Sequence, residues 1–125
     1  MEKIKLEGLN ELVFYEKLEN GLDVYVPVGT PIYSVANGRI SRETYWGGTG
    51  LVVYVEHLIN GERYTSVYEH LSNNTVLPVG TNVNKDTVIA YSGNTGESTG
   101  PHLHLSIIRG WYLTDWYYWD QTYCC

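Results

Sequence analysis

The sequence predicts an all-β protein with a single domain, in which antiparallel sheets pack as a sandwich or as a barrel-like hybrid. Two observations support this prediction. The 13 glycines and 4 prolines divide the chain into short segments, and β-branched and aromatic residues fill the gaps, which is the pattern of closely spaced strands. The length of 125 residues suits one domain, and a hydrophobic content of 43% is too high for a disordered chain.

The pattern of apolar residues and turns predicts seven strands and two flanking segments. The expected strands cover residues 22–26, 31–35, 38–43, 51–56, 63–68, 87–92 and 103–109. The continuous apolar run Leu51–Val55 is typical of a central strand that is buried on both faces. The domain organisation is expected to be a lead-in at 1–18 with weak helical periodicity, a β domain at 19–110, and an aromatic-rich segment at 111–125. Packing of this segment on the sheet is favoured over stacking on sugar or peptide and over pairing with another chain.

Turn signals connect these strands. The dipeptide Asn60-Gly61 is typical of a two-residue hairpin turn, and the nearby His57 is expected to be a surface residue at a strand end. The segment Pro27–Thr30 (Pro-Val-Gly-Thr) recurs as Pro78–Thr81. This repetition predicts two similar β units that pack together.

A pair of histidines near the C-terminal end carries the strongest functional signal. His102 and His104 follow a long glycine-rich loop at 92–101. Positions i and i+2 of a strand point to the same face, so both imidazoles are aimed at one place while Leu103 and Leu105 point into the core. One metal ligand and one proton-transfer group can lie side by side in this arrangement.

Composition excludes several other classes of protein. A net charge of −6 disfavours binding to nucleic acid, which requires a basic surface. The chain has no apolar run long enough to span a bilayer, and its N-terminus lacks the apolar region of a signal peptide. We therefore expect a cytoplasmic protein or a mature or excised domain. The adjacent cysteines Cys124 and Cys125 cannot link distant segments and do not define the redox compartment.

Several motifs together indicate a family. The motifs are Gly21–Asp23, Pro27–Gly38, Gly47–Gly50, Val53–His57, Tyr68–Ser72, and above all Ser98-Thr99-Gly100-Pro101-His102-Leu103-His104. Over about residues 23–109, the chain resembles the lysostaphin-like (LytM-type) zinc metallopeptidases, which cleave peptide cross-links in bacterial peptidoglycan. The resemblance implies the lysostaphin-like β fold and a bound Zn²⁺.

The resemblance also implies roles for individual residues. Asp23 and His104 match zinc ligands of the family, His102 matches the general base, and His70 matches a second catalytic histidine that orients water and stabilises the oxyanion. These roles are chemically coherent, because zinc activates water and polarises a carbonyl, and a neutral imidazole can accept a proton near pH 7.

One expected ligand differs. The family's His-x-Gly-x-Asp motif reads Glu19-Asn20-Gly21-Leu22-Asp23 here, so a glutamate stands where the resemblance leads us to expect a histidine. A carboxylate can bind zinc, and Glu19, Asp23 and His104 form a possible three-ligand site. The alternative is that Glu19 is a solvated carboxylate and the metal is lost.

The leading hypothesis is a zinc-dependent endopeptidase whose partner is the peptide part of peptidoglycan, located extracellularly or in the cell envelope as the resemblance implies. A second hypothesis is a catalytically degenerate relative that acts as a binding or scaffold module, because Glu19 replaces the expected histidine. A third is a lipoyl- or biotinyl-type carrier domain, although the context of Lys85 does not match the modified lysine of such domains. The oligomeric state does not follow from the sequence.

Overall fold

The structure, a computed structural model, describes residues 21–72, 77–96 and 98–111. The described part of the chain forms β-strands and no helix, and therefore no helix that could cross a membrane. The strands are β1 (Leu22–Val24), β2 (Pro31–Tyr33), β3 (Gly38–Trp46), β4 (Gly50–Ile59), β5 (Glu62–Leu71), β6 (Asn82–Val83), β7 (Val88–Tyr91) and β8 (Leu103–Arg109).

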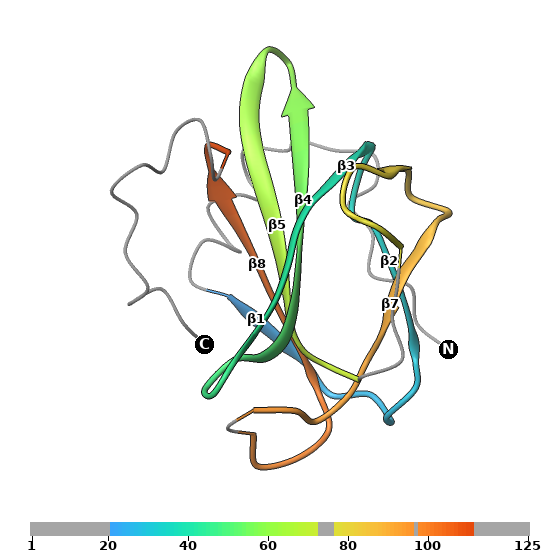
Figure 1. Ribbon diagram of the computed structural model, residues 1–125, viewed down its shortest axis with the longest axis vertical. Helices are drawn as coiled ribbons and strands as arrows, with labels where there is room; N and C mark the ends of the chain where they lie inside the picture. Colours follow the sequence, from blue (N-terminus) through green and yellow to red (C-terminus); the bar gives the residue numbers. More distant parts are fainter. Residues whose placement is uncertain (1–20, 73–76, 97, 112–125) are drawn as a thin grey trace.

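The strands form two antiparallel sheets. The larger sheet has six strands in the order β1-β8-β5-β4-β3-β6, and the smaller sheet pairs β2 with β7. Figure 1 shows the β2–β7 pair standing beside the larger sheet, with β8 between β1 and β5. The all-β prediction with packed antiparallel sheets is therefore confirmed.

The predicted turns have the backbone conformations that their residues favour. Asn60 and Gly61 both have positive φ angles, 52° and 80°, as a type I′ hairpin turn between β4 and β5 requires. In the repeated segments, Gly29 (φ 90°) and Gly80 (φ 98°) occupy equivalent turns. Each turn is closed by the threonine that follows, whose amide donates to the proline carbonyl at 3.2 Å. The repeated sequence is therefore a repeated local structure.

The main core lies between the two sheets. Alternating residues of β4, β5 and β8 point toward β2 and β7, and Leu103 and Leu105 are both 0% exposed. The buried members of this core are Ile32, Val35, Ile40, Val53, Val55, Tyr64, Tyr68, Leu71, Val83, Ile89, Ala90, Leu103, Leu105 and Ile107. His104 alternates with the core residues Leu103 and Leu105, and it therefore points to the opposite face of the larger sheet.

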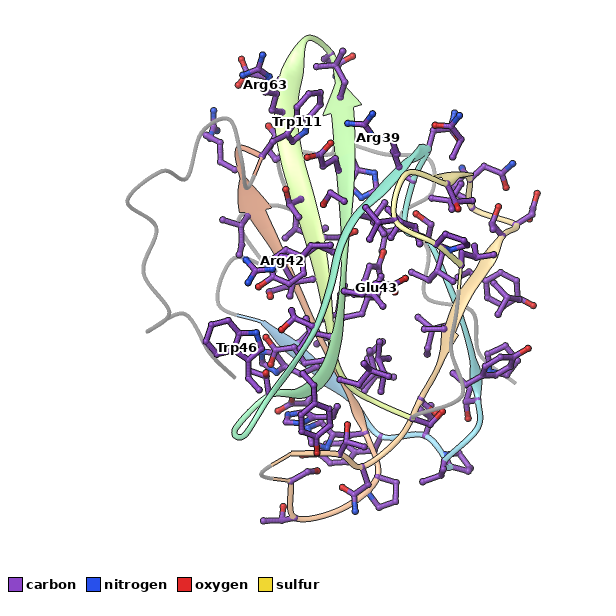
Figure 2. All side chains as sticks on the ribbon, viewed as in Figure 1. Arg39, Arg42, Glu43, Trp46, Arg63 and Trp111 are labelled. Carbon is purple, nitrogen blue, oxygen red and sulfur yellow. The ribbon has the colours of Figure 1, made fainter. Side chains whose placement is uncertain are left out.

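The outer face of the larger sheet, which points away from β2 and β7, carries a second apolar cluster of Val52, Tyr54 and Val67. β4 is thus buried on both faces, as the run Leu51–Val55 predicts. On β3, Arg42 lies over the rings of Tyr54 (5.4 Å) and Trp46 (5.8 Å). Figure 2 shows Arg42 and Glu43 on opposite sides of β3, in agreement with the alternation of a strand.

The structure departs from the predicted elements in several respects, and β1, β2 and β7 are shorter than expected. β3, β4 and β5 are longer than expected, because the hairpins that join them continue the ladder to the turns and because β5 also extends to Leu71, which pairs with Leu51 of β4. β6, a two-residue strand beside β3, was not predicted because so short a strand has no periodicity. In the aromatic segment only Trp111 is described, and its indole donates to the His57 carbonyl at 2.9 Å; residues 1–20 and 112–125 lie outside the described residues.

The prediction for His57 was wrong. His57 is 1% exposed because β4 continues past residue 56, which places His57 on the core face with Val53 and Val55. Its Nδ1 lies 2.8 Å from the Asn37 carbonyl and its Nε2 lies 2.7 Å from the Ser66 hydroxyl. Burial lowers the pKa of His57 to about 4.

Candidate active site

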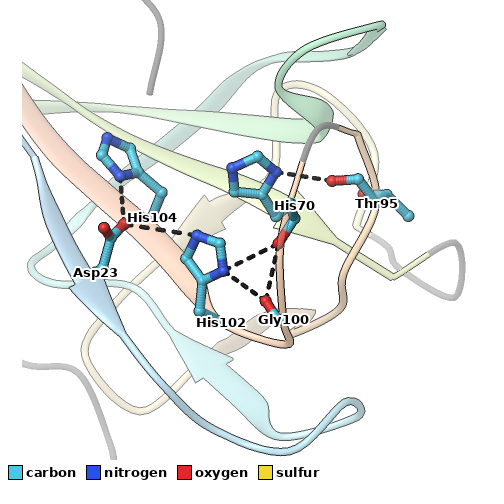
Figure 3. Close-up of polar contacts among 7 residues, drawn as sticks. Asp23, His70, Thr95, Gly100, His102 and His104 are labelled. Carbon is cyan, nitrogen blue, oxygen red and sulfur yellow. Dashed lines mark hydrogen bonds and ion pairs between the residues drawn. The ribbon is translucent and has the colours of Figure 1, made fainter.

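Four polar side chains from three strands meet on the outer face of the larger sheet (Figure 3). The register places Asp23 of β1 opposite His104 of β8, and His104 opposite Glu69 of β5. His102 lies next to the start of β8, and His70 comes from the end of β5. The strand pairing therefore gathers residues that are up to 81 positions apart in the chain.

Asp23 and His104 form the closest pair. The Nδ1 atom of His104 lies 2.7 Å from Oδ1 of Asp23, and His102 Nε2 lies 3.6 Å from the same oxygen. The Asp23 side chain is 45% exposed, whereas the two imidazoles are 10–11% exposed. The carboxylate thus stands at the solvent-facing edge of a nearly buried histidine pair.

The backbone of Gly21 lies close to the His104 ring. A Cβ atom at position 21 would lie 2.3 Å from both Cε1 and Nε2 of His104, and the φ angle of Gly21 is +96°. Both the close approach and the backbone conformation exclude a side chain at this position. The Gly-x-Asp spacing therefore supplies backbone contact on one side of the imidazole and a carboxylate on the other.

The ring of His102 is held by backbone and hydroxyl groups. Its Nδ1 lies 2.8 Å from the Gly100 carbonyl and 3.1 Å from the Ser98 hydroxyl. A carbonyl oxygen only accepts hydrogen bonds, so Nδ1 carries a proton. In the neutral ring, Nε2 is then the basic nitrogen, and it is the atom nearest to Asp23.

His70 is held in the same way. Its Nδ1 donates to the Thr95 carbonyl at 2.7 Å, which leaves Nε2 as the basic nitrogen of the neutral ring. Burial lowers the pKa of His70, and the hydrogen bond to Thr95 opposes this shift without cancelling it. The ring centroid of His70 lies 4.8 Å from that of His102 and 6.5 Å from that of His104.

A backbone irregularity turns His70 toward the other histidines. His70 has a φ angle of 63°, in the left-handed region, and the register between β4 and β5 shifts between Leu51 and Val53. In a regular strand, His70 would share the core face with Tyr68. The bulge instead directs its ring to the outer face, as bulges near active sites often do.

Thr95 fastens the glycine-rich loop to the sheet. Its hydroxyl donates to the Leu71 carbonyl at 2.6 Å and accepts from the Leu51 amide at 3.1 Å, while its own carbonyl binds His70. Gly50 allows this contact, because a Cβ atom there would lie 2.4 Å from the Thr95 hydroxyl oxygen. The loop at 92–101 was recognised in the sequence, but the role of Thr95 was missed because its partners are distant in sequence.

The donor atoms of Asp23 and His104 are of the types that zinc binds, a carboxylate oxygen and an imidazole nitrogen, and they face each other. Catalytic zinc sites commonly have three protein ligands. Among residues 21–72, 77–96 and 98–111, no group of three or more His, Cys, Asp or Glu side chains is arranged to hold a metal ion. Glu19, the predicted third ligand, lies outside the described residues.

The structure thus brings Asp23, His70, His102 and His104 together, whereas the placement of Glu19 is not described. Their catalytic and metal-binding roles remain predictions. The Gly100 and Thr95 carbonyls, which help to orient the two imidazoles, are backbone groups. The identities of the side chains do not predict contacts to backbone carbonyls. Only the Gly-Pro turn before His102 indicates one of these contacts, that of the Gly100 carbonyl with His102.

Comparisons with known proteins identify relatives with this architecture. The profile of Peptidase family M23 matches residues 17–115. The chain is 38% identical over 92 residues to the peptidoglycan DD-endopeptidase ShyA of Vibrio cholerae, covering 73% of this chain and 20% of ShyA. It therefore spans about a fifth of the length of that curated relative.

Solved structures agree with the sequence comparison. The catalytic domain of lysostaphin from Staphylococcus simulans superposes with a TM-score of 0.64 at 32% identity, over 72% of this chain and 66% of that one. A zinc-containing peptidase from Vibrio cholerae superposes with a TM-score of 0.65 at 32% identity, over 73% of this chain and 27% of that one. The expected resemblance to lysostaphin-like peptidases is confirmed, and the chain belongs to Peptidase family M23.

Proposed function

We propose that this chain is a metal-dependent endopeptidase domain that hydrolyses peptide bonds in bacterial peptidoglycan. One observation carries the proposal: His70 and His102 both have Nδ1 bound to a backbone carbonyl, and both present a basic Nε2 beside the Asp23–His104 pair. Two oriented proton acceptors next to two zinc-type donor atoms suit metal-assisted hydrolysis of a peptide bond. The similarity to the DD-endopeptidase ShyA supports the substrate class.

His102 is proposed as the general base. Its Nε2 takes the proton of the attacking water, and the same nitrogen can then deliver that proton to the leaving amine. While the ring is charged, the Gly100 carbonyl and the Ser98 hydroxyl hold its Nδ1–H. The ring orientation is therefore maintained through both proton transfers.

His70 is proposed to orient the attacking water. Because its pKa is lowered, the ring is neutral at pH 7, and its proton lies on Nδ1 toward Thr95. The Nε2 atom can therefore accept a hydrogen bond from water. If the ring takes up a proton during the reaction, it can instead donate to the developing oxyanion.

Asp23 and His104 are the proposed zinc ligands, with Glu19 as the third. Zinc, when bound, supplies a Lewis acid that polarises the scissile carbonyl and lowers the pKa of water. With Glu19 in place of a histidine, the site has two anionic ligands, which is expected to weaken the Lewis acidity of the metal. The substrate class implies that the protein works in the cell envelope or outside the cell.

The direct test is hydrolysis of purified bacterial cell walls, followed as loss of turbidity. We expect clearing that stops when a chelator is added, returns with Zn²⁺, and is absent in the His102→Ala variant. Arg109→Gln, which removes an exposed ion pair with Glu62 and the cation–π contact with the Tyr64 ring, is the surface control and should clear walls at the rate of the unmodified protein. Clearing that persists in excess chelator would contradict the proposal.

Glu19 favours one alternative, a degenerate relative that binds without hydrolysis. This alternative predicts that purified protein holds no zinc and that Glu19→His introduces both zinc binding and activity. One tightly bound zinc per chain, together with loss of hydrolysis in Glu19→Ala, would exclude it. Elemental analysis of protein purified without added metal separates the two proposals.

A further inference from the structure

Tyr25 lies beside the candidate site, although no part of the proposed chemistry uses it. The pairing of β1 with β8 matches Asp23 with His104 and Val24 with Leu103. One further step along this register brings Tyr25 opposite His102, and the two ring centroids are 5.4 Å apart with an interplanar angle of 34°. Tyr25 therefore continues the face that Asp23 begins, two residues earlier.

Packing does not explain this ring. Tyr25 is 73% exposed, more than Tyr45 (62%) or Tyr91 (39%). It follows β1, which is the last strand in the order of the larger sheet. A large aromatic side chain that is mostly exposed, yet packed against a proposed general base, is typical of a surface that a partner covers.

A peptide that reaches the nitrogen atoms of His102 and the Asp23–His104 pair comes close to the exposed ring of Tyr25, which contacts His102. The Nε2 atom of His102 lies 3.6 Å from Asp23, so the place where a scissile bond can be attacked is close to both residues. Tyr25 stands next to that place and has an apolar ring that is open to solvent. An aliphatic part of the substrate can pack on the ring and displace water from it.

We propose that Tyr25 is a substrate-positioning residue whose ring packs against the residue adjoining the scissile bond, on the β1 side of the site. This inference rests on the proposed peptidase function and extends it to a specific contact. The ring, rather than the hydroxyl group, supplies the interaction. The expected contribution is to substrate binding, since an apolar ring neither donates nor accepts the protons that move in the proposed mechanism.

The test compares Tyr25→Ala with Tyr25→Phe on cross-linked muropeptide dimers released from cell walls. We expect Tyr25→Ala to raise KM about five- to tenfold with kcat changed less than about twofold, as expected for removing the contact of one ring face. Tyr25→Phe should keep the KM of the unmodified protein. Tyr91→Ala, which removes an exposed tyrosine from β7 in the smaller sheet, is the matched control and should leave KM unchanged.

A binding measurement separates failure of this inference from failure of the proposed function. In a His70→Ala background, calorimetric titration with the same dimers reports affinity without turnover. Weaker binding by about five- to tenfold on adding Tyr25→Ala, with full rescue by Tyr25→Phe and equal melting temperatures, supports the contact. Equal affinity with and without the Tyr25 ring, an equal loss in Tyr91→Ala, or no measurable binding of the dimers would overturn it.

Discussion

Gly21 and Gly29 both have backbone conformations that disfavour a side chain, but only at Gly21 would a side chain also collide with a neighbouring residue. Both have positive φ angles, +96° and +90°. A Cβ atom at Gly21 would strike the His104 ring, whereas a Cβ atom at Gly29 would meet nothing within 4 Å. A substitution at either position strains the backbone, but only the one at Gly21 displaces an imidazole from Asp23.

We therefore expect Gly21→Ala to weaken zinc binding about tenfold or more, the range seen when the support of a metal ligand is disturbed. Gly29→Ala should lower the melting temperature through backbone strain alone and leave zinc affinity unchanged. Competition with a chromophoric chelator measures the affinity, and thermal unfolding measures the stability. Equal zinc affinities in the two variants would show that the His104 ring tolerates the added methyl group.

Glu43 is a second residue of interest, because the partial burial of its carboxyl group makes the stability of the protein depend on pH. Burial raises the pKa of Glu43 above 4.5, and in the described part of the chain its buried Oε2 atom has no hydrogen-bond partner. Above pH 4.5 the folded protein therefore binds more protons than the unfolded chain, so this group makes the protein less stable as the pH rises through its folded pKa.

Replacing Glu43 with glutamine removes the ionisable group. The Glu43→Gln variant should be more stable than the unmodified protein at pH 7.5, and the difference should shrink toward pH 4. Urea unfolding at the two pH values measures this difference. Glu62→Gln, at an exposed residue paired with Arg109, is the control and should give no such pH-dependent gain; a Glu43→Gln variant less stable at pH 7.5 would contradict the prediction.

Among the structural elements, the candidate site depends on the attachment of the glycine-rich loop to β4 and β5. The loop at 92–101 carries the carbonyls that orient His70 and His102, and Thr95 joins it to Leu51 of β4 and Leu71 of β5. The bulge at the end of β5 turns His70 toward this loop. The orientation of the two imidazoles therefore depends on the position of this loop relative to the bulge.

Thr95→Val should therefore damage both stability and activity. Valine keeps the shape of threonine but removes the hydroxyl group's hydrogen bonds with the Leu51 amide and the Leu71 carbonyl. Loss of a hydrogen bond at a buried group costs about 1–3 kcal/mol. We expect lower unfolding free energy and lower kcat for wall hydrolysis, with Thr95→Ser restoring most of both. Full activity in Thr95→Val would mean that the Thr95 hydroxyl is not needed to hold the loop.

Across the whole molecule, the sequence predicts best those strands whose two faces differ strongly in polarity. β8 was predicted with its correct bounds because His102 and His104 alternate with Leu103, Leu105 and Ile107. The end of β4 was placed too early because the polar residues near the hairpin do not alternate, and the end of β5 was placed too early because a bulge interrupts the alternation before Leu71. The meeting of Asp23 with His104 follows from a β1–β8 pairing that no local pattern encodes, so only the family resemblance could indicate it.

The bulge at His70 and the burial of His57 could not be predicted from the sequence either, because both depend on contacts between strands. No glycine marks the left-handed position at His70, and a histidine in that conformation is not recognisable from its neighbours. His57 is buried because Gly38 of β3 leaves space beside its ring, where a Cβ atom would lie 2.8 Å from Nδ1. Both features depend on contacts between strands, which the order of residues within one strand does not contain.

The burial of His57 makes the stability of the whole fold depend on pH. The neutral ring is hydrogen-bonded at both nitrogens, and Ser66 continues the network to the Tyr68 hydroxyl at 2.9 Å. The folded pKa of about 4 lies below the ordinary value of 6.5, so between these values the unfolded chain binds more protons. Stability from this group is fully present above pH 6.5 and is lost as the pH falls toward 4.

The expected slope from His57 is about 1.4 kcal/mol of unfolding free energy per pH unit within that window. Because other groups also titrate, the measurement is the difference between the unmodified protein and His57→Gln, obtained by urea unfolding at steps from pH 4.5 to 7.5. His57→Gln should be less stable at pH 7.5, since glutamine cannot reproduce both hydrogen bonds, and this deficit should narrow as the pH falls. A deficit that stays constant across the range would show that His57 does not titrate on unfolding, and that its buried network affects stability through packing alone.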